Sequence, residues 1–134
     1  MTINSAHRLN VPQIPVSWGE LFDKICILEI KKENAVNQMA MTNITKEFDI
    51  LINLISNEIL TNSEVMKLWL KLKEINQNIW NIEDEIRIKE EANDFGERFI
   101  ELARNTYLFN DTRASIKRRI NEILKSEIVE EKVY

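Results

Sequence analysis

The sequence predicts an all-α fold, a long helical hairpin or small helix bundle, on three observations. Apolar residues recur at helical spacing along most of the chain. The two glycines stand at positions 19 and 96 and the two prolines at 12 and 15, so no helix breaker interrupts residues 20–95. Polar residues that favour helix starts precede several of the apolar runs. We expect five helices in a single helical domain, residues 11–134, after a disordered N-terminus over residues 1–10.

The first predicted helix covers residues 18–40 and begins at a capping box. Pro12 and Pro15 favour an extended path before it. In the capping box, the Ser17 hydroxyl accepts a hydrogen bond from the Glu20 N–H, and the Glu20 carboxylate reaches back to the Ser17 N–H. The polar run over residues 42–45 predicts the end of this helix, and a shorter helix is expected over 46–60.

A long helix over about 63–91 is the most regular predicted element and the spine of the fold. Residues 61–64 form a capping sequence before it. Its apolar seam steps by three and four residues through Val65, Leu68, Leu72, Ile75, Ile79, Ile82 and Ile86. This heptad period is typical of a coiled coil. The seam can pack against residues 18–40 of the same chain, pack between subunits, or do both.

Two shorter helices are predicted at the C-terminal end. A turn at 94–96 precedes a helix over 97–107, whose inward residues are expected to be Phe99, Leu102, Ala103 and Tyr107. Asn110 and Asp111 are expected to end that element and to cap the last helix, 112–124, because their side chains can accept from the following N–H groups.

The scarcity of histidine, cysteine and glycine excludes several kinds of chemistry. One histidine, His7, and one cysteine, Cys26, cannot build a Cys/His zinc site, a disulfide or a Cys-x-x-Cys pair. Two distant glycines cannot form a phosphate-binding loop or a nucleophile elbow. Cys26, in the middle of a helix, is expected to be a buried structural thiol. We therefore expect no cofactor, no metal and no catalytic residue.

Charge and hydropathy indicate a cytoplasmic protein. The net charge of −4 argues against broad binding to nucleic acid or to a membrane. No signal peptide and no apolar run long enough to span a bilayer is evident.

The carboxylate pairs do not match a known magnesium site. In all-α nucleotide pyrophosphohydrolases, an E-x-x-E helix precedes an E-x-x-D helix and both hold Mg²⁺. Here the two E-x-x-D pairs, Glu20/Asp23 and Glu91/Asp94, come before the only E-x-x-E pair, Glu127/Glu130. The order is reversed, and we expect these carboxylates to belong to solvated faces.

A basic stretch runs from Arg104 to Arg119, with Asp111 as its only acid. Arginines near a helix N-terminus can hold a phosphate or carboxylate. If the two ends of the chain meet at one end of the bundle, a ligand site would comprise Lys24, Arg104, Asn110, Asp111, Arg113 and Arg119. The alternative is that these arginines pair with glutamates of neighbouring helices.

The chain also resembles a small bacterial family known only as a domain of unknown function. The match begins with S-W-G-E-L-F-D-K-I (from Ser17), includes N-D-T-R-A-S-I-K-R-R-I-N (from Asn110) and ends with S-E-I-V-E-E-K-V-Y (from Ser126). It covers nearly the whole chain after residue 10 and implies no activity, cofactor or catalytic residue. Members often carry Gly where this chain has Lys125, which implies a left-handed backbone there if that residue follows a helix C-terminus.

Two functions follow as expectations. The first is a non-enzymatic, homo-oligomeric interaction or accessory protein, a homodimer through surplus apolar faces, which can also bind another protein. The alternative is a binding protein or small enzyme for an anionic metabolite, a nucleotide or sugar phosphate, at the Arg104–Arg119 cluster. Nucleic-acid binding is a weaker third interpretation, because acidic helices flank the cluster.

Overall fold

The computed structural model describes residues 10–134, and the segment expected to be disordered, with His7, lies outside them except for residue 10. The helices within the described residues are α2 (Trp18–Asn34), α3 (Gln38–Ile52), α4 (Asn57–Leu60), α5 (Ser63–Glu91) and α6 (Glu97–Ile123). No strand occurs in this part of the chain, which confirms the all-α fold. None of these helices is both long and apolar enough to cross a membrane.

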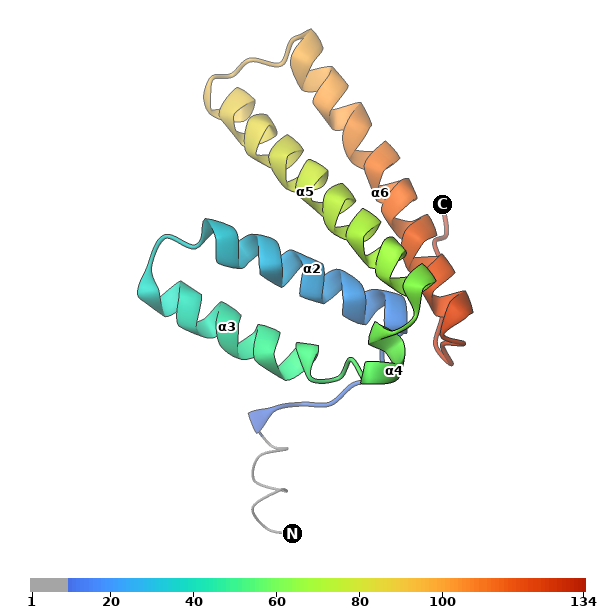
Figure 1. Ribbon diagram of the computed structural model, residues 1–134. Helices are drawn as coiled ribbons and strands as arrows, with labels where there is room; N and C mark the ends of the chain where they lie inside the picture. Colours follow the sequence, from blue (N-terminus) through green and yellow to red (C-terminus); the bar gives the residue numbers. More distant parts are fainter. Residues whose placement is uncertain (1–9) are drawn as a thin grey trace.

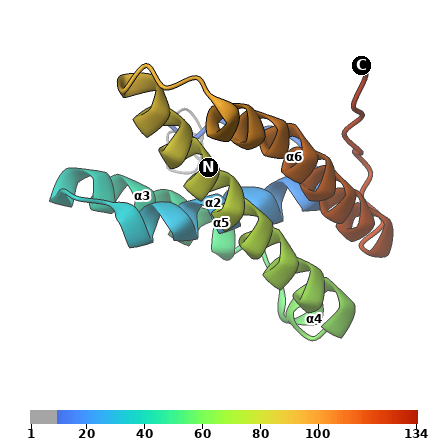
Figure 2. The same cartoon turned by 90° about the horizontal axis from the view of Figure 1, so that it is seen from above.

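The helices form two hairpins that diverge from a common end. The first hairpin pairs α2 with α3, the second pairs α5 with α6, and the short α4 connects them (Figure 1). Seen from above, α5 and α6 cross the direction of the first hairpin (Figure 2). The first turn of α2 and the last turns of α6 therefore meet at the common end.

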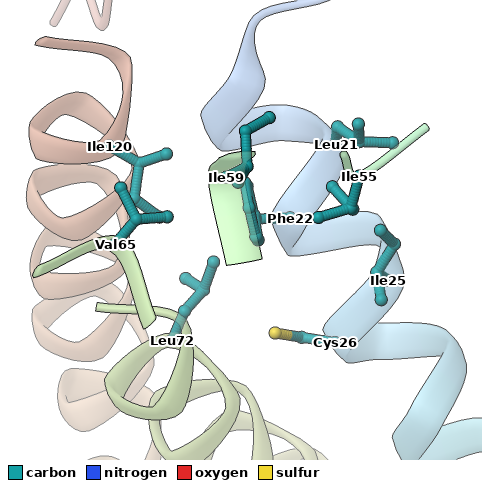
Figure 3. Close-up of a cluster of buried hydrophobic side chains, with 9 residues drawn as sticks. All are labelled: Leu21, Phe22, Ile25, Cys26, Ile55, Ile59, Val65, Leu72 and Ile120. Carbon is teal, nitrogen blue, oxygen red and sulfur yellow. The ribbon is translucent and has the colours of Figure 1, made fainter. Parts of the chain in front are cut away.

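The hydrophobic core lies at this common end (Figure 3). Its buried side chains come from α2, from α4 and the loop before it, from α5 and from α6; they are Leu21, Phe22, Ile25, Cys26, Ile55, Ile59, Val65, Leu72 and Ile120. The Phe22 ring meets the ring of Trp69 edge to face, with 4.9 Å between the centroids. Helices α2 and α6, the first and the last within residues 10–134, thus contribute to the same core.

Helix α2 begins as predicted but ends six residues early. The Ser17 hydroxyl accepts from the Glu20 N–H at 3.1 Å, whereas the Glu20 carboxylate binds Lys117 instead of reaching back to Ser17. The helix ends at Asn34 and not at residue 40. The reason is Asn37, whose side chain accepts from the Ala40 N–H at 2.8 Å and so starts a new helix.

The expected break at residues 42–45 is wrong, because these residues lie inside α3. Thr42 continues the helix while its hydroxyl donates to the Gln38 carbonyl at 2.9 Å. No residue of α3 is fully buried, so this helix packs on α2 through a half-buried face only. The helix predicted over 46–60 is divided in the structure, since α3 ends at Ile52 and Ser56 caps α4.

Helix α5 has the bounds that the sequence predicts, and Asn62 caps it by accepting from the Val65 N–H at 3.1 Å. All seven seam residues are buried or half-buried within the chain. The hairpin partner of α5 is α6, however, and not residues 18–40, although α2 packs on α5 as well. The apolar seam of α5 is long enough to contact both α6 and α2.

The two shorter C-terminal helices expected from the sequence are a single helix, α6. Neither Gly nor Pro occurs within Glu97–Ile123, and Asn or Asp alone costs a helix interior only about 0.7 kcal/mol. The side chains of Asn110 and Asp111 do not cap a helix. Asn110 accepts from Arg113, and Asp111 accepts from the Tyr134 hydroxyl.

Helices α5 and α6 both end in a Schellman motif with a left-handed residue. After α6, Lys125 has a φ of 53° and the Ser126 N–H donates to the Asn121 carbonyl at 2.8 Å. The left-handed backbone implied for Lys125 by the family resemblance is therefore confirmed. After α5, Asn93 has a φ of 51° and begins the predicted turn at 94–96.

Candidate functional site

The N-terminus of α2 is capped by the end of α6. The Trp18 N–H donates to the Ser126 hydroxyl at 2.8 Å, and the Gly19 N–H donates to the Asn121 side-chain oxygen at 2.6 Å. Together with the bond from Glu20 to Ser17, these contacts satisfy the first three N–H groups of α2, which no helix can satisfy within itself.

Gly19 allows this close contact. A Cβ atom at position 19 would lie 2.5 Å from the backbone carbonyl oxygen of Lys117 and 3.0 Å from the Asn121 side-chain oxygen. The missing side chain lets the backbones of α2 and α6 approach, and this approach brings the acids of α2 within reach of the bases of α6.

A buried carboxylate, Asp23, joins three helices one turn further along α2. It is 1% exposed. Its Oδ1 accepts from the Asn76 amide of α5 at 2.8 Å and from Nε of Arg113 at 2.9 Å, and its Oδ2 accepts from Nη2 of Arg113. A buried charge is tolerated when it is paired and hydrogen-bonded in this way.

The guanidinium of Arg113 is consequently fixed in orientation. Two of its nitrogens bind Asp23, and Nη1 donates to the Asn110 side chain at 3.3 Å. The hydrogen bonds to Asp23 raise the pKa of Arg113, although burial opposes this. Three of its five N–H groups are used, and the side chain is 26% exposed. Part of an oriented cation therefore faces outward.

Lys117 lies one turn after Arg113 on α6 and binds carboxylates from two directions. Its Nζ is 2.8 Å from Glu20, 3.7 Å from Asp23 and 3.4 Å from Glu130. Burial lowers the pKa of Lys117, but its hydrogen bond to Glu20 and the nearby carboxylates outweigh this and raise the pKa. The ammonium group is thus held charged.

The C-terminal tail, residues 127–134, turns back beside α6 (Figure 1). Glu130 meets Lys117, Glu131 meets Arg118 at 2.9 Å, and the Tyr134 hydroxyl donates to Asp111 at 3.1 Å. Every residue of the tail is exposed. Exposed ion pairs of this kind contribute little free energy, about 0–1 kcal/mol each.

A groove of about 570 Å³ lies between α6, the first turn of α2 and the C-terminal tail. Its lining residues are Glu20, Asn110, Arg113, Ala114, Ser115, Lys117, Arg118, Asn121, Glu130 and Lys132. Every ionisable side chain among them forms an ion pair. The groove presents cations together with an amide and a hydroxyl, a combination that suits an anionic ligand.

The residues predicted to bind a ligand do not all meet at this groove. Asn110 and Arg113 line it. Asp111 binds the C-terminal tail beside it. Lys24 is exposed on α2, and Arg119 forms surface ion pairs with glutamates of α5 and α6. The remaining residue, Arg104, lies beside a separate hollow in the N-terminal half of α6.

The sequence interpretation missed Asp23 and Lys117 as partners. Glu20 and Asp23 drew attention only as an E-x-x-D pair, a possible metal motif. The signal that could have indicated this pairing is the spacing of the charges. Two acids near the start, Glu20 and Asp23, are three residues apart, and two bases, Arg113 and Lys117, are four apart, so the members of each pair lie on one face of a helix.

Metal ligation and thiol chemistry find no further support in residues 10–134. No group of three or more His, Cys, Asp or Glu side chains is placed there to hold a metal ion. Cys26 is buried as predicted. Burial, with the nearby charges of Glu29 and Asp23, raises the pKa of its thiol to about 12, so it is not a thiolate at neutral pH.

Comparison with known proteins identifies a family whose function is unknown. A family model described as a family of unknown function (DUF6165) matches residues 12–134. No curated protein and no solved structure matches the chain significantly.

Proposed function

Since the chain belongs to DUF6165, a family of unknown function, we propose a function from its own side chains. The protein is a non-enzymatic binding protein for a small phosphate-bearing metabolite, a nucleotide or a sugar phosphate, in the groove beside α6. One observation carries this proposal: the buried Asp23 holds the guanidinium of Arg113 at the wall of that groove.

A pre-oriented arginine favours anion recognition. A free arginine loses side-chain entropy when it binds a phosphate, whereas Arg113 is already fixed by Asp23 and Asn110. The two N–H groups that these residues leave free suit the geometry of phosphate oxygens. Lys117, four residues further on α6, adds a second charge on the same side of the helix.

The C-terminal tail supplies the group that a ligand would replace. Glu130 is more than half exposed and lies 3.4 Å from Lys117, so this ion pair is weak. A phosphate at the same place keeps the charge balance of Lys117 and can also bind Arg113. Ser115 and Asn110 offer a hydroxyl and an amide for the rest of the ligand.

The pairing of the groove residues favours binding over catalysis. A general acid or base needs a titratable group that is free to exchange a proton with the substrate. The carboxylates of the groove, Glu20 and Glu130, are both bound to Lys117. Glu20 is therefore engaged with Lys117, and Glu130 is the group that the ligand displaces, so neither carboxylate is placed to exchange a proton with the ligand.

The experiment measures binding to two variants with the same change of charge. The wild-type protein is titrated calorimetrically with AMP, ADP, glucose 6-phosphate and inorganic phosphate. Arg118→Glu places a negative charge in the groove and is expected to weaken binding about tenfold or more, equivalent to about 1.4 kcal/mol. Arg119→Glu, the next residue on α6 but outside the groove, is expected to change affinity less than twofold.

Arg113→Lys is the third variant, because it keeps the charge beside Asp23 but loses the planar fork. We expect it to fold and to bind more weakly than the wild type. Failure of all four ligands to bind the wild-type protein would contradict the proposal. Equal losses in the Arg118 and Arg119 variants would place the binding outside the groove.

A further inference from the structure

The N-terminal half of α6 carries a second apolar stripe on its outer side. Ile100, Tyr107 and Leu108 are 54%, 54% and 50% exposed, and Ala103 is also exposed. The sequence interpretation placed Ala103 and Tyr107 inward. In the structure Phe99 and Leu102 form the inner face toward α5, and the spacing of the other apolar residues turns them to the opposite side. Helix α6 thus has an apolar stripe on two sides, and its hairpin partner α5 covers only one of them.

A hollow of about 390 Å³ lies along this outer side. It is lined by Glu97, Ile100, Glu101, Arg104, Asn105 and Leu108. Arg104 stands between the two aliphatic side chains, is exposed and forms no ion pair with any residue in 10–134. The two glutamates lie one and two turns before it. The face therefore offers apolar surface, an unpaired cation and carboxylates together.

We propose that this face of α6 binds the same face of a second copy of the chain, antiparallel, with the two-fold axis close to Arg104. In this register Ile100 packs against Leu108 of the partner subunit. Each Arg104 lies about one turn from Glu101 of the partner subunit, within reach of an ion pair. A surface that carries both signs of charge around an apolar stripe is self-complementary, as a two-fold interface requires.

The proposed interface is independent of the groove and small. The groove involves the C-terminal half of α6, whereas this face involves the N-terminal half. Residues 100–108 span about 12 Å along the helix axis. Such a contact is near the lower limit for specific association. The dimer should consequently dissociate on dilution.

The first test measures the mass of the full chain by light scattering over a range of concentrations. The wild type should approach twice 15.9 kDa at high concentration. Arg104→Glu should remain a monomer because four carboxylates then meet near the axis. Adding Glu101→Arg to this variant should restore the dimer by exchanging the two charges. Lys67→Glu, an equally large charge change at an exposed position near the start of α5, should leave the dimer unchanged.

Three outcomes would overturn the proposal: a wild-type monomer at every concentration, an Arg104→Glu dimer, or a double variant that stays monomeric. A second test gives the position of the axis. Cys26 is fully buried, so an introduced cysteine is the reactive thiol among residues 10–134. Arg104→Cys should form a disulfide-linked dimer under mild oxidation, and Lys67→Cys should not. Equal yields from the two variants would refute the two-fold contact at Arg104.

Discussion

The close approach of α2 and α6 at Gly19 predicts a large loss of stability in Gly19→Ala. The added Cβ would lie 2.5 Å from the backbone carbonyl oxygen of Lys117, which cannot rotate away as a side chain could. The two helices must separate, and the 2.6 Å hydrogen bond from the Gly19 N–H to Asn121 weakens as they do.

The magnitude follows from three contributions. Overpacking costs about 1–3 kcal/mol, and a lost hydrogen bond costs about 0.5–1.5 kcal/mol. The better helix propensity of alanine returns up to about 1 kcal/mol. We therefore expect the free energy of unfolding to fall by about 2.5 kcal/mol. For a chain of this length that corresponds to a decrease in Tm of about 9 °C.

Gly96→Ala is the matched control. A Cβ atom at position 96 would meet only the Asp94 side chain, at 3.4 Å, and the φ of Gly96 is −77°, which alanine adopts readily. Because Gly96 is the N-cap of α6, where glycine is favoured over alanine, we expect a loss of about 0.5–1 kcal/mol, well below that of Gly19→Ala. Thermal and urea unfolding followed by circular dichroism measures both variants. If Gly19→Ala unfolds at the same temperature as Gly96→Ala, the close packing of α2 on α6 is refuted.

Two further predictions concern the left-handed residues and the buried thiol. Lys125→Gly should raise the free energy of unfolding by about 1 kcal/mol, because a left-handed backbone costs about 1–2 kcal/mol for a residue with a Cβ. Asn93→Gly, a control at an equivalent position, should gain less since asparagine tolerates this conformation; equal Tm values for Lys125→Gly and the wild type would contradict this. The raised pKa of Cys26, about 12 in the folded chain against 9.0 for a free thiol, predicts that the unfolded chain loses the thiol proton first as the pH rises. Between pH 9 and 12 the free energy of unfolding should therefore fall by about 1.4 kcal/mol per pH unit from this group. Urea unfolding at pH 8 and 10.5 should show this loss in the wild type and a smaller one in Cys26→Ala, and identical losses would refute it.

The elements predicted correctly are those whose signals are local. Helix α5 has seven seam residues in register, a capping Asn62 and no helix breaker, so its bounds follow from the sequence. The error in α2 has a similar local origin. The helix ends before Asn37 because the Asn37 side chain accepts from a free N–H of the following helix. The polar run at 42–45 causes no break, since the Thr42 hydroxyl bonds back to a carbonyl of its own helix.

The break expected at Asn110 and Asp111 failed for a reason that sequence spacing does not show. Capping residues end a helix only when their side chains turn to the backbone, and here other side chains bind both of them: Arg113, one turn further along α6, binds Asn110, and Tyr134 of the C-terminal tail binds Asp111. The same is true of the site. Asp23 and Arg113 are 90 residues apart, and nothing in either neighbourhood indicates that Gly19 brings their helices into contact.

The capping of α2 by the end of α6 has a consequence for biosynthesis. Helix α2 is synthesised before the other helices described above, yet it depends on Asn121 and Ser126, more than a hundred residues later, for two of its N–H groups. The same late segment supplies Ile120 to the core around Phe22. A nascent chain that ends before residue 120 leaves this core open, and α3 buries too little to close it. Folding should therefore complete only after α6 is synthesised, when the contact between α2 and the end of α6 closes a loop of about a hundred residues in a late step.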